Sequence, residues 1–280
     1  MFRMFPLLLI TLLGVAVTAH ASIKHKPNTN AIPGGIVILP LGEYHQPPKA
    51  FFAKQPVLVM PAKQPDHWQA VVGIPLRQPL GEAFITVNDQ PIHFVVNAHE
   101  YPSQHLTVQR HHVHPNPEQL ARIRRETQQM QPVYRHYRRS EGWPEFIWPL
   151  HGRISSPFGF QRFFNGEARN PHSGLDIAAP TGTPIQAPAA GIVTLTGDFY
   201  FNGKSVFIDH GQGLISMMCH LDRIDVQDGQ TLQAGDVIGT VGQTGRATGP
   251  HLHWTVSLND ARVDPMLVLP NTPTDQGHAR

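Results

Sequence analysis

Two histidines separated by one residue begin an apolar run near the C-terminus. His251 and His253 follow the glycine- and proline-containing stretch 245–250, and the run continues to Val256. In an extended strand, residues i and i+2 project from the same face, with a rise of about 3.3 Å per residue. The two imidazoles are therefore predicted to lie side by side. Both could bind a metal ion, or one could bind the metal while the other carries a proton.

Two other stretches supply side chains of the same kinds. His172 and Asp176 are four residues apart, and even steps along a strand would direct both into one cleft. His220 ends a hydrophobic run, directly after Cys219. That residue is the only cysteine, so an intramolecular disulfide is excluded and a metal site must use His, Asp or Glu.

These residue types match a catalytic zinc site. Zinc binds imidazole nitrogen and carboxylate oxygen at about 2.0–2.2 Å, and catalytic sites use three protein ligands and keep the fourth position open. Two histidines and one carboxylate complete such a set, which leaves two histidines for proton transfer and for stabilising an oxyanion. Bound zinc lowers the pKa of water to about 7, and an ordinary histidine, with a pKa near 6.5, is suited to exchange that proton.

Four other histidines are predicted to have ordinary roles. His111, His112 and His114 are interpreted as part of a flexible polar connector rather than a second metal site, because no carboxylate lies nearby in the sequence. His210 is predicted to be a plain residue of a turn between two strands.

The elements that must position these residues are predicted to be mainly β. Short runs of β-forming residues separated by turn signals indicate a small N-terminal β-sandwich, with strands near 36–39, 57–60, 68–74, 83–87 and 92–96 and a hairpin at 88–91. From residue 146 onward the strands are interrupted by glycines, which is typical of a compact antiparallel β-sheet or barrel-like domain.

One helix is predicted between the two halves. Asn116 is a good N-cap, Pro117 and Glu118 suit the first turn, and Pro132 is expected to limit the helix. The arginines at 135, 138 and 139 are interpreted as a solvated face rather than as substrate contacts. We therefore predict a signal peptide at 1–21, an N-terminal β-sandwich at 22–112, a linker with the helix at 113–143, a C-terminal β domain that carries the candidate zinc site at 144–270 and a flexible tail at 271–280.

Composition and the N-terminus indicate export. The 280 residues carry a net charge of +2 with neutral histidines, which is too weak to favour nucleic acid as a partner. A basic start, an apolar run over 7–17 and a small-x-small ending predict a signal peptide cleaved after Ala21, and the apolar run is short for a membrane span. A periplasmic protein without stable membrane insertion is expected.

The second half, roughly residues 146–266, resembles the lysostaphin/LytM-type zinc metallopeptidases, which cut peptide bonds in bacterial peptidoglycan. The resemblance rests on His172 with Asp176, on the single His220 and on His251 with His253, in that order and spacing. The flanking stretches 154–159, 180–184 and 244–250 also match. More loosely, the first half is similar to the β-rich N-terminal module of exported Gram-negative members.

This resemblance implies a set of roles. His172, Asp176 and His253 would bind one Zn²⁺ per chain, while His220 and His251 would activate water and stabilise the tetrahedral intermediate, in an order the sequence leaves open. The implied function is a zinc-dependent murein endopeptidase acting on peptidoglycan cross-links between D-alanine and diaminopimelate. One departure is Met218-Cys219, where the family commonly has an aromatic and a small residue; strand alternation predicts that Cys219 faces away from His220 and is not a ligand.

Two alternatives qualify that expectation. A non-catalytic module of the same fold would bind peptidoglycan or activate another cell-wall hydrolase, but such modules usually lack ligands and this chain lacks none. Alternatively, the N-terminal domain or the linker could cover the cleft and keep the enzyme latent.

Overall fold

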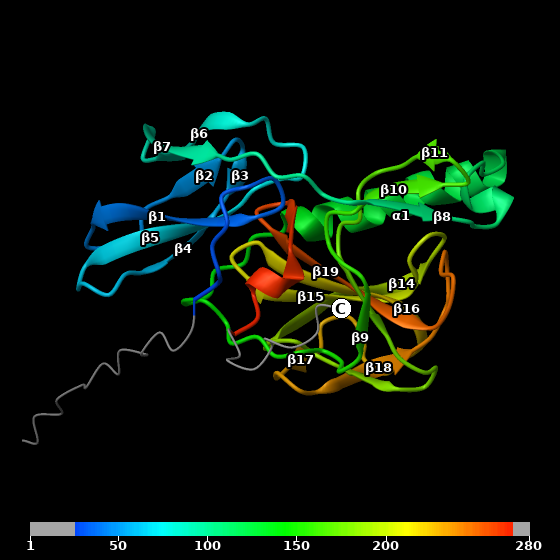
Figure 1. Cartoon of the computed structure of the whole chain (residues 1–280). Helices are drawn as coiled ribbons and strands as arrows, with labels where there is room; N and C mark the ends of the chain where they lie inside the picture. The colour runs from blue at the N-terminus through cyan, green and yellow to red at the C-terminus, as the bar shows by residue number, and fades with distance from the viewer. Residues whose placement is uncertain (1–25, 271–280) are drawn as a thin grey trace, which may run out of the picture.

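The computed structural model describes residues 26–270. The predicted signal peptide and C-terminal tail therefore lie outside the described residues. The chain is mainly β, with antiparallel sheets and a single α-helix among the described residues, as the sequence predicted (Figure 1). Within residues 26–270, no helix is long and apolar enough to cross a membrane.

Two small sheets form the N-terminal sandwich. One contains β1 (Ile36–Glu43), β5 (His67–Gly73) and β4 (Leu58–Pro61), in that order. The other contains β3 (Gln55–Pro56), β2 (Ala50–Phe52), β6 (Gly81–Val87) and β7 (Gln90–Val96). Buried apolar side chains from both sheets share one core, so the predicted sandwich is confirmed.

The predicted hairpin between the last two strands of this sandwich is confirmed. Val87 of β6 pairs with Gln90 of β7, so the turn consists of Asn88 and Asp89 alone. Both turn residues have positive φ, +47° and +66°. This is the backbone that a two-residue type I′ turn requires, and Asn and Asp tolerate it better than most residues.

The chain then leaves the sandwich and pairs with the second half. Strand β8 (Ser103–Leu106) runs parallel to β10 (Gln161–Phe164), which is also paired with β11 (Glu167–Ala168). The 3₁₀ turn η1 (Arg110–His112) follows β8. A segment that the sequence placed with the N-terminal domain therefore borders the candidate site.

The helix α1 (Pro117–Arg135) begins where the sequence predicted. The Asn116 side chain accepts a hydrogen bond from the Gln119 backbone N–H, and the Gln119 side chain accepts one from the Asn116 backbone, which forms a capping box. The predicted end was wrong, because the helix continues through Pro132. Proline removes one backbone hydrogen bond, but packing of Met130, Val133 and Tyr134 on the large sheet holds the last turn.

The arginines at the end of α1 were interpreted as a solvated face; Arg135 and Arg139 are exposed as expected, but two of the three make ion pairs with the second half. Arg135 Nε lies 2.9 Å from Asp260 Oδ2, and Arg138 Nε lies 3.0 Å from the buried Asp209 Oδ2. These ion pairs fix the end of the helix to the second half of the chain.

The large sheet forms the body of the second half. Its main path is β17 (Thr231–Leu232), β14 (Gly191–Phe199), β15 (Gly203–Gly211), β16 (Leu214–Ile224), β19 (His251–Leu258), β12 (Leu175–Ala178) and β9 (Arg153–Ser156). Strand β18 (Val237–Val241) pairs with β16 and β13 (Pro184–Gln186), and β20 (Ala261–Val263) pairs with β19. The 3₁₀ turn η2 (Pro265–Leu267) follows β20. The predicted antiparallel, barrel-like sheet is confirmed (Figure 1).

The two halves share buried structure. The main apolar core contains Ile36, Leu58, Met60 and Val71 from the N-terminal sheets together with side chains of the large sheet. The side chain of Asn259 accepts from the Gly73 N–H at 2.7 Å and donates to the Gly73 carbonyl at 3.0 Å. The domain boundaries drawn from the sequence remain predictions.

His210 is not a plain turn residue, and that prediction was wrong. It lies in β15, is buried, and has both ring nitrogens hydrogen bonded, Nδ1 to the Ala190 carbonyl at 2.8 Å and Nε2 to Ser216 Oγ at 2.9 Å. The glycines after it suggested a turn, but strand pairing continues to Gly211.

Candidate metal centre

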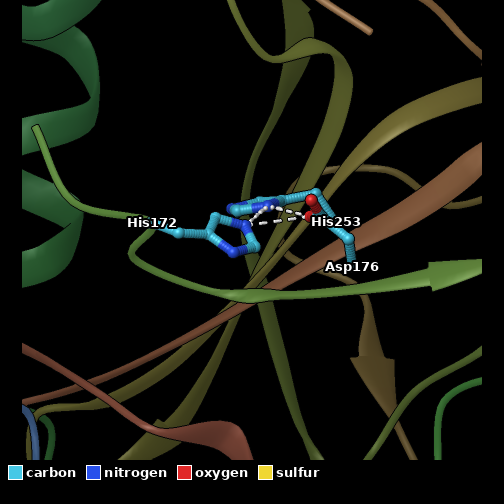
Figure 2. Close-up of side chains that lie close together, drawn as sticks. All are labelled: His172, Asp176 and His253. Carbon is cyan, nitrogen blue, oxygen red and sulfur yellow. Dashed lines mark hydrogen bonds and ion pairs between the residues drawn. The ribbon is translucent and has the colours of Figure 1, made fainter. Parts of the chain in front are cut away.

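Three side chains from distant parts of the second half converge at one point. Asp176 of β12 lies directly opposite His253 of β19, and Asp176 Oδ1 is 2.7 Å from His253 Nδ1. His172 Nε2 completes the group, at 3.0 Å from both of those atoms (Figure 2). His172 reaches the cluster from the loop that precedes β12, not from the strand that the sequence suggested.

The outer nitrogens of both imidazoles have partners. His172 Nδ1 lies 2.7 Å from the Pro157 carbonyl, which can only accept, so Nδ1 carries the proton and Nε2 presents a lone pair. His253 Nε2 lies 2.9 Å from Thr255 Oγ1, to which it can donate, and its Nδ1 then presents a lone pair. Hydrogen bonds of this kind orient the histidine ligands of metal sites.

The electrostatics favour the protonation states that bind metals. Burial lowers the pKa of His253 to about 4, although Asp176 opposes that shift. Burial alone would raise the pKa of Asp176, but the two imidazoles outweigh it and hold that pKa well below its usual value. An ionised Asp176 and a neutral His253 therefore face one another, with His172 Nε2 turned towards both, and a bound cation would satisfy all three acceptors.

The donor set fits zinc. Among the His, Cys, Asp and Glu side chains of residues 26–270, these three lie close enough together to hold one metal ion. Their donor atoms lie within 4.8 Å of one another. Two imidazole nitrogens and one carboxylate oxygen form a ligand set typical of catalytic zinc. The geometry thus agrees with the ligand assignment that the resemblance implied, which remains a proposal until a metal is bound.

A partly buried arginine supports the carboxylate, and the sequence reasoning missed it. Arg162 of β10 donates from Nη2 to Asp176 Oδ2 at 2.8 Å and to Ser156 Oγ at 3.2 Å. Ser156 Oγ also donates to Gln104 Oε1 of β8 at 3.1 Å. No sequence signal pointed to Arg162, because only the pairing of β8, β10 and β11 brings it to Asp176.

His220 and His251 lie beside the cluster. Their ring centroids are 4.8 Å apart, and His251 Nε2 is 3.8 Å from Asp176 Oδ1. His220 Nδ1 donates to the Thr244 carbonyl and His251 Nδ1 to the Gly249 carbonyl, each at 2.8 Å. Both Nε2 atoms are therefore free to accept a proton, although burial lowers the pKa of His220 to about 3.

The backbone at His220 departs from a regular strand. His220 has φ of +64°, at a point where the register between β15 and β16 shifts. A bulge of this kind redirects a side chain, so the simple alternation used to predict the direction of Cys219 does not apply there.

Cys219 pairs with His253 across the strands but packs in an apolar cluster with Phe207 and Met217. Burial raises the pKa of its thiol to about 12, and it is not part of the metal-binding group.

The connector histidines lie elsewhere and do not converge on a second ion. The rings of His111 and His112 are 4.1 Å apart and both contact Tyr200. The fold nevertheless brings a carboxylate to one of them, because His114 Nε2 lies 2.8 Å from Glu167 Oε1. Glu167 is distant in sequence, so only the fold reveals that pair.

Comparison with known proteins shows the family of the chain. Residues 170–265 match the description "Peptidase family M23", and residues 29–99 match "Peptidase family M23 N-terminal domain". A crystal structure of a Pseudomonas aeruginosa protein assigned to peptidase M23 is 45% identical, with a TM-score of 0.72, and covers 86% of this chain and 96% of that one. The chain belongs to peptidase family M23. The expected relationship is therefore confirmed for both halves.

Two curated bacterial proteins are similar to this chain over less than half of its length. The DD-carboxypeptidase/endopeptidase Mpg of Neisseria meningitidis serogroup B is 40% identical over 124 residues, which is 44% of this chain and 29% of that protein. The peptidoglycan DD-endopeptidase ShyC of Vibrio cholerae serotype O1 is 38% identical over 138 residues, 45% of this chain and 32% of that protein. The match thus spans about a third of the length of these relatives.

Proposed function

We propose that this chain is a zinc-dependent murein endopeptidase that hydrolyses the D-alanine–diaminopimelate cross-links of peptidoglycan. The observation that carries the proposal is the convergence of His172 Nε2, Asp176 Oδ1 and His253 Nδ1 beside two histidines with free Nε2 atoms. The names of the relatives, both of which include DD-peptidase activity, support the substrate class.

The chemistry divides among the residues of the site. His172, Asp176 and His253 would hold one zinc ion, which supplies the Lewis acidity that activates water for attack on an amide. His220 and His251 are anchored through Nδ1, so a free Nε2 would take up the proton of the water, and the imidazolium formed in this way would stabilise charge that develops on the amide oxygen. Arg162 would keep the Asp176 carboxylate oriented.

Digestion of purified Gram-negative peptidoglycan tests the proposal. We expect the protein to convert cross-linked muropeptide dimers into monomers, with loss of activity in a zinc chelator and recovery on adding zinc. His253→Ala should lose both bound zinc and hydrolysis, while a conservative change outside the site, Arg124→Gln, should leave both intact. Zinc binding without any cleavage would favour the alternative, a non-catalytic peptidoglycan-binding module or an activator of another hydrolase.

The proposed location is the periplasm, after export. The argument is the sequence of residues 1–21, together with the cell-wall substrate named for the relatives. Mass spectrometry of the protein recovered from a periplasmic fraction should give a mature N-terminus at Ser22. A protein that retains residues 1–21 would contradict cleavage after Ala21.

We also propose that the segment before the second half limits access to the site. Strand β8 runs beside β10, and the ring of His105 stacks on that of Phe163 at 4.6 Å. Breaking this pairing with His105→Pro should raise the rate on intact peptidoglycan, because proline removes a backbone donor. An unchanged or lower rate would contradict latency and would instead assign β8 a supporting role, consistent with the contact between Gln104 and Ser156.

A further inference from the structure

A second arginine near the metal centre is held between two aromatic rings. The guanidinium carbon of Arg246 lies 4.7 Å from the ring centroid of Phe164 and 4.4 Å from that of Phe201. Its backbone N–H donates to the Phe201 carbonyl at 2.8 Å. Two cation–π contacts and a backbone anchor fix a side chain that would otherwise have many rotamers.

This guanidinium has no internal counterion among the described residues. No carboxylate within residues 26–270 lies at ion-pair distance from Arg246. Burial first, and then repulsion from Arg162 and Arg169, lowers its pKa to about 10, so it stays protonated at neutral pH. A desolvated cation beside other cations is unfavourable, and an anion arriving from outside would offset that cost.

The position of Arg246 is next to the proposed chemistry. Arg162 and Phe164 are two residues apart on β10 and so project from the same face, about 7 Å apart along the strand. Arg162 contacts the metal-site carboxylate, and Phe164 supports Arg246. The loop between β18 and β19, which carries Arg246, also presents the Thr244 carbonyl that accepts a hydrogen bond from His220. Neighbouring positions on one face of β10 thus link the metal-site carboxylate to Arg246.

We infer that Arg246 is a specificity-determining residue that binds a free carboxylate of the substrate beside the scissile amide. The inference rests on the proposed function, since it names the feature of the cross-link that this site recognises. Diaminopimelate carries such a carboxylate on the carbon whose amine is acylated by D-alanine. A guanidinium fork matches a carboxylate through two parallel hydrogen bonds, which a carboxamide cannot reproduce.

Two synthetic muropeptide dimers test the inference. They share the D-alanine–diaminopimelate link and differ only in whether the neighbouring diaminopimelate carboxylate is free or amidated. For the zinc-loaded, full-length protein, we expect kcat/KM to be about 10- to 100-fold higher for the free carboxylate, as for a charge-assisted hydrogen bond. Arg246→Gln should reduce that ratio to about one, and Arg246→Lys should give an intermediate ratio.

A binding measurement separates this inference from the proposed function. Calorimetry with the metal-free protein should show tighter binding of the free-carboxylate dimer to the wild type, and no such preference in Arg246→Gln. The exposed Arg124→Gln serves as the matched control and should keep the preference. Where Arg246→Gln fails to fold by circular dichroism, the ratio measured for Arg246→Lys decides.

The outcomes are distinct. Cleavage of both dimers at equal rates by the wild type, or an unchanged ratio in the folded Arg246 variants, would overturn the inference and leave the endopeptidase proposal intact. Cleavage of neither dimer would count against the proposed function, and the calorimetric preference would still decide the role of Arg246.

Discussion

At the scale of single residues, the candidate site depends on groups that surround the ligands as much as on the ligands. His172 and His253 each have an outer nitrogen hydrogen bonded, and Asp176 has its second oxygen bonded to Arg162. Partners of this kind fix which nitrogen carries a proton and where each donor atom points. They make the three acceptor atoms face one another before any ion arrives.

Loss of the arginine beside Asp176 should weaken the metal site without removing a ligand. We predict that Arg162→Gln lowers zinc affinity about 10- to 100-fold, the range typical of outer-shell partners. The reason is that Asp176 Oδ2 loses its charged donor. Competition with a chromophoric chelator measures the affinity directly. Arg169→Gln removes a nearby positive charge that contacts Glu167 rather than Asp176, and should change affinity little; equal losses in both variants would refute a positioning role.

His210 should make the free energy of unfolding depend on pH. Burial lowers its pKa to about 4 in the folded protein, below the ordinary 6.5 of the unfolded chain. The unfolded state therefore binds the proton first, so stability is complete above pH 6.5 and falls as the pH drops towards 4. At pH 5 the loss is about 2 kcal/mol.

Urea denaturation of the wild type and of His210→Gln at a series of pH values checks this linkage. The glutamine side chain keeps a donor and an acceptor but does not titrate. We expect the difference in unfolding free energy between the two proteins to shift by about 2 kcal/mol from pH 7 to pH 5. A constant difference over that range would mean that His210 is not the titrating group.

At the scale of elements, the site is created by the pairing of β12 with β19 and by the loop that leads into β12. Gly174 in that loop packs closely against β19, since a Cβ at this position would lie 2.6 Å from the Trp254 carbonyl oxygen and 2.7 Å from the His253 ring. The loop can pass this close to β19 only because residue 174 has no side chain. The absence of a side chain at Gly174 thus lets the loop bring His172 close to His253 on β19.

Gly174→Ala should disturb the metal centre from outside the ligand set. The added methyl group has no space, so the variant should lose about 1–3 kcal/mol of stability and bind zinc more weakly. Thermal unfolding and chelator competition measure the two effects. Gly249→Ala is the control, because a Cβ there meets nothing within 4 Å. Equal behaviour of the two variants would contradict the packing argument.

At the scale of the whole molecule, the two halves are joined by a common core and by hydrogen bonds buried between them. Apolar side chains of β1, β4 and β5 pack with those of the large sheet, and Asn259 bonds both backbone groups of Gly73. The N-terminal sandwich therefore contributes to the stability of the half that carries the site. A single cooperative unfolding transition is the expected consequence.

Removing the Asn259 side chain should weaken that junction. Asn259 has φ of +46°, so Asn259→Gly keeps a backbone that glycine adopts easily while deleting two buried hydrogen bonds. We predict a loss of about 2–3 kcal/mol, because Gly73 is left with unpaired backbone groups. Calorimetry measures the change. Asn88→Gly, at a similar φ of +47° in an exposed turn, should be nearly neutral, and a comparable loss there would point to a backbone effect instead.

Local patterns in the sequence were sufficient for much of this structure. Asn116 and Gln119 formed the helix cap within one turn, and Asn88 with Asp89 formed the hairpin turn, because capping and turn chemistry act between near neighbours. The five histidine and aspartate positions of the site were also identified from their order and spacing. Short-range geometry and family resemblance carry that information without knowledge of the fold.

Only the tertiary structure showed which groups surround those residues. Arg162 reaches Asp176, and Arg246 lies between Phe164 and Phe201, because strand pairing and loop packing bring together residues that are distant in the chain. His210 proved to be buried because the strand continues past the point where glycines suggested a turn. The sequence by itself thus determined the candidate reactive residues, and the fold decided their tautomers, charges and partners, which depend on contacts across the chain.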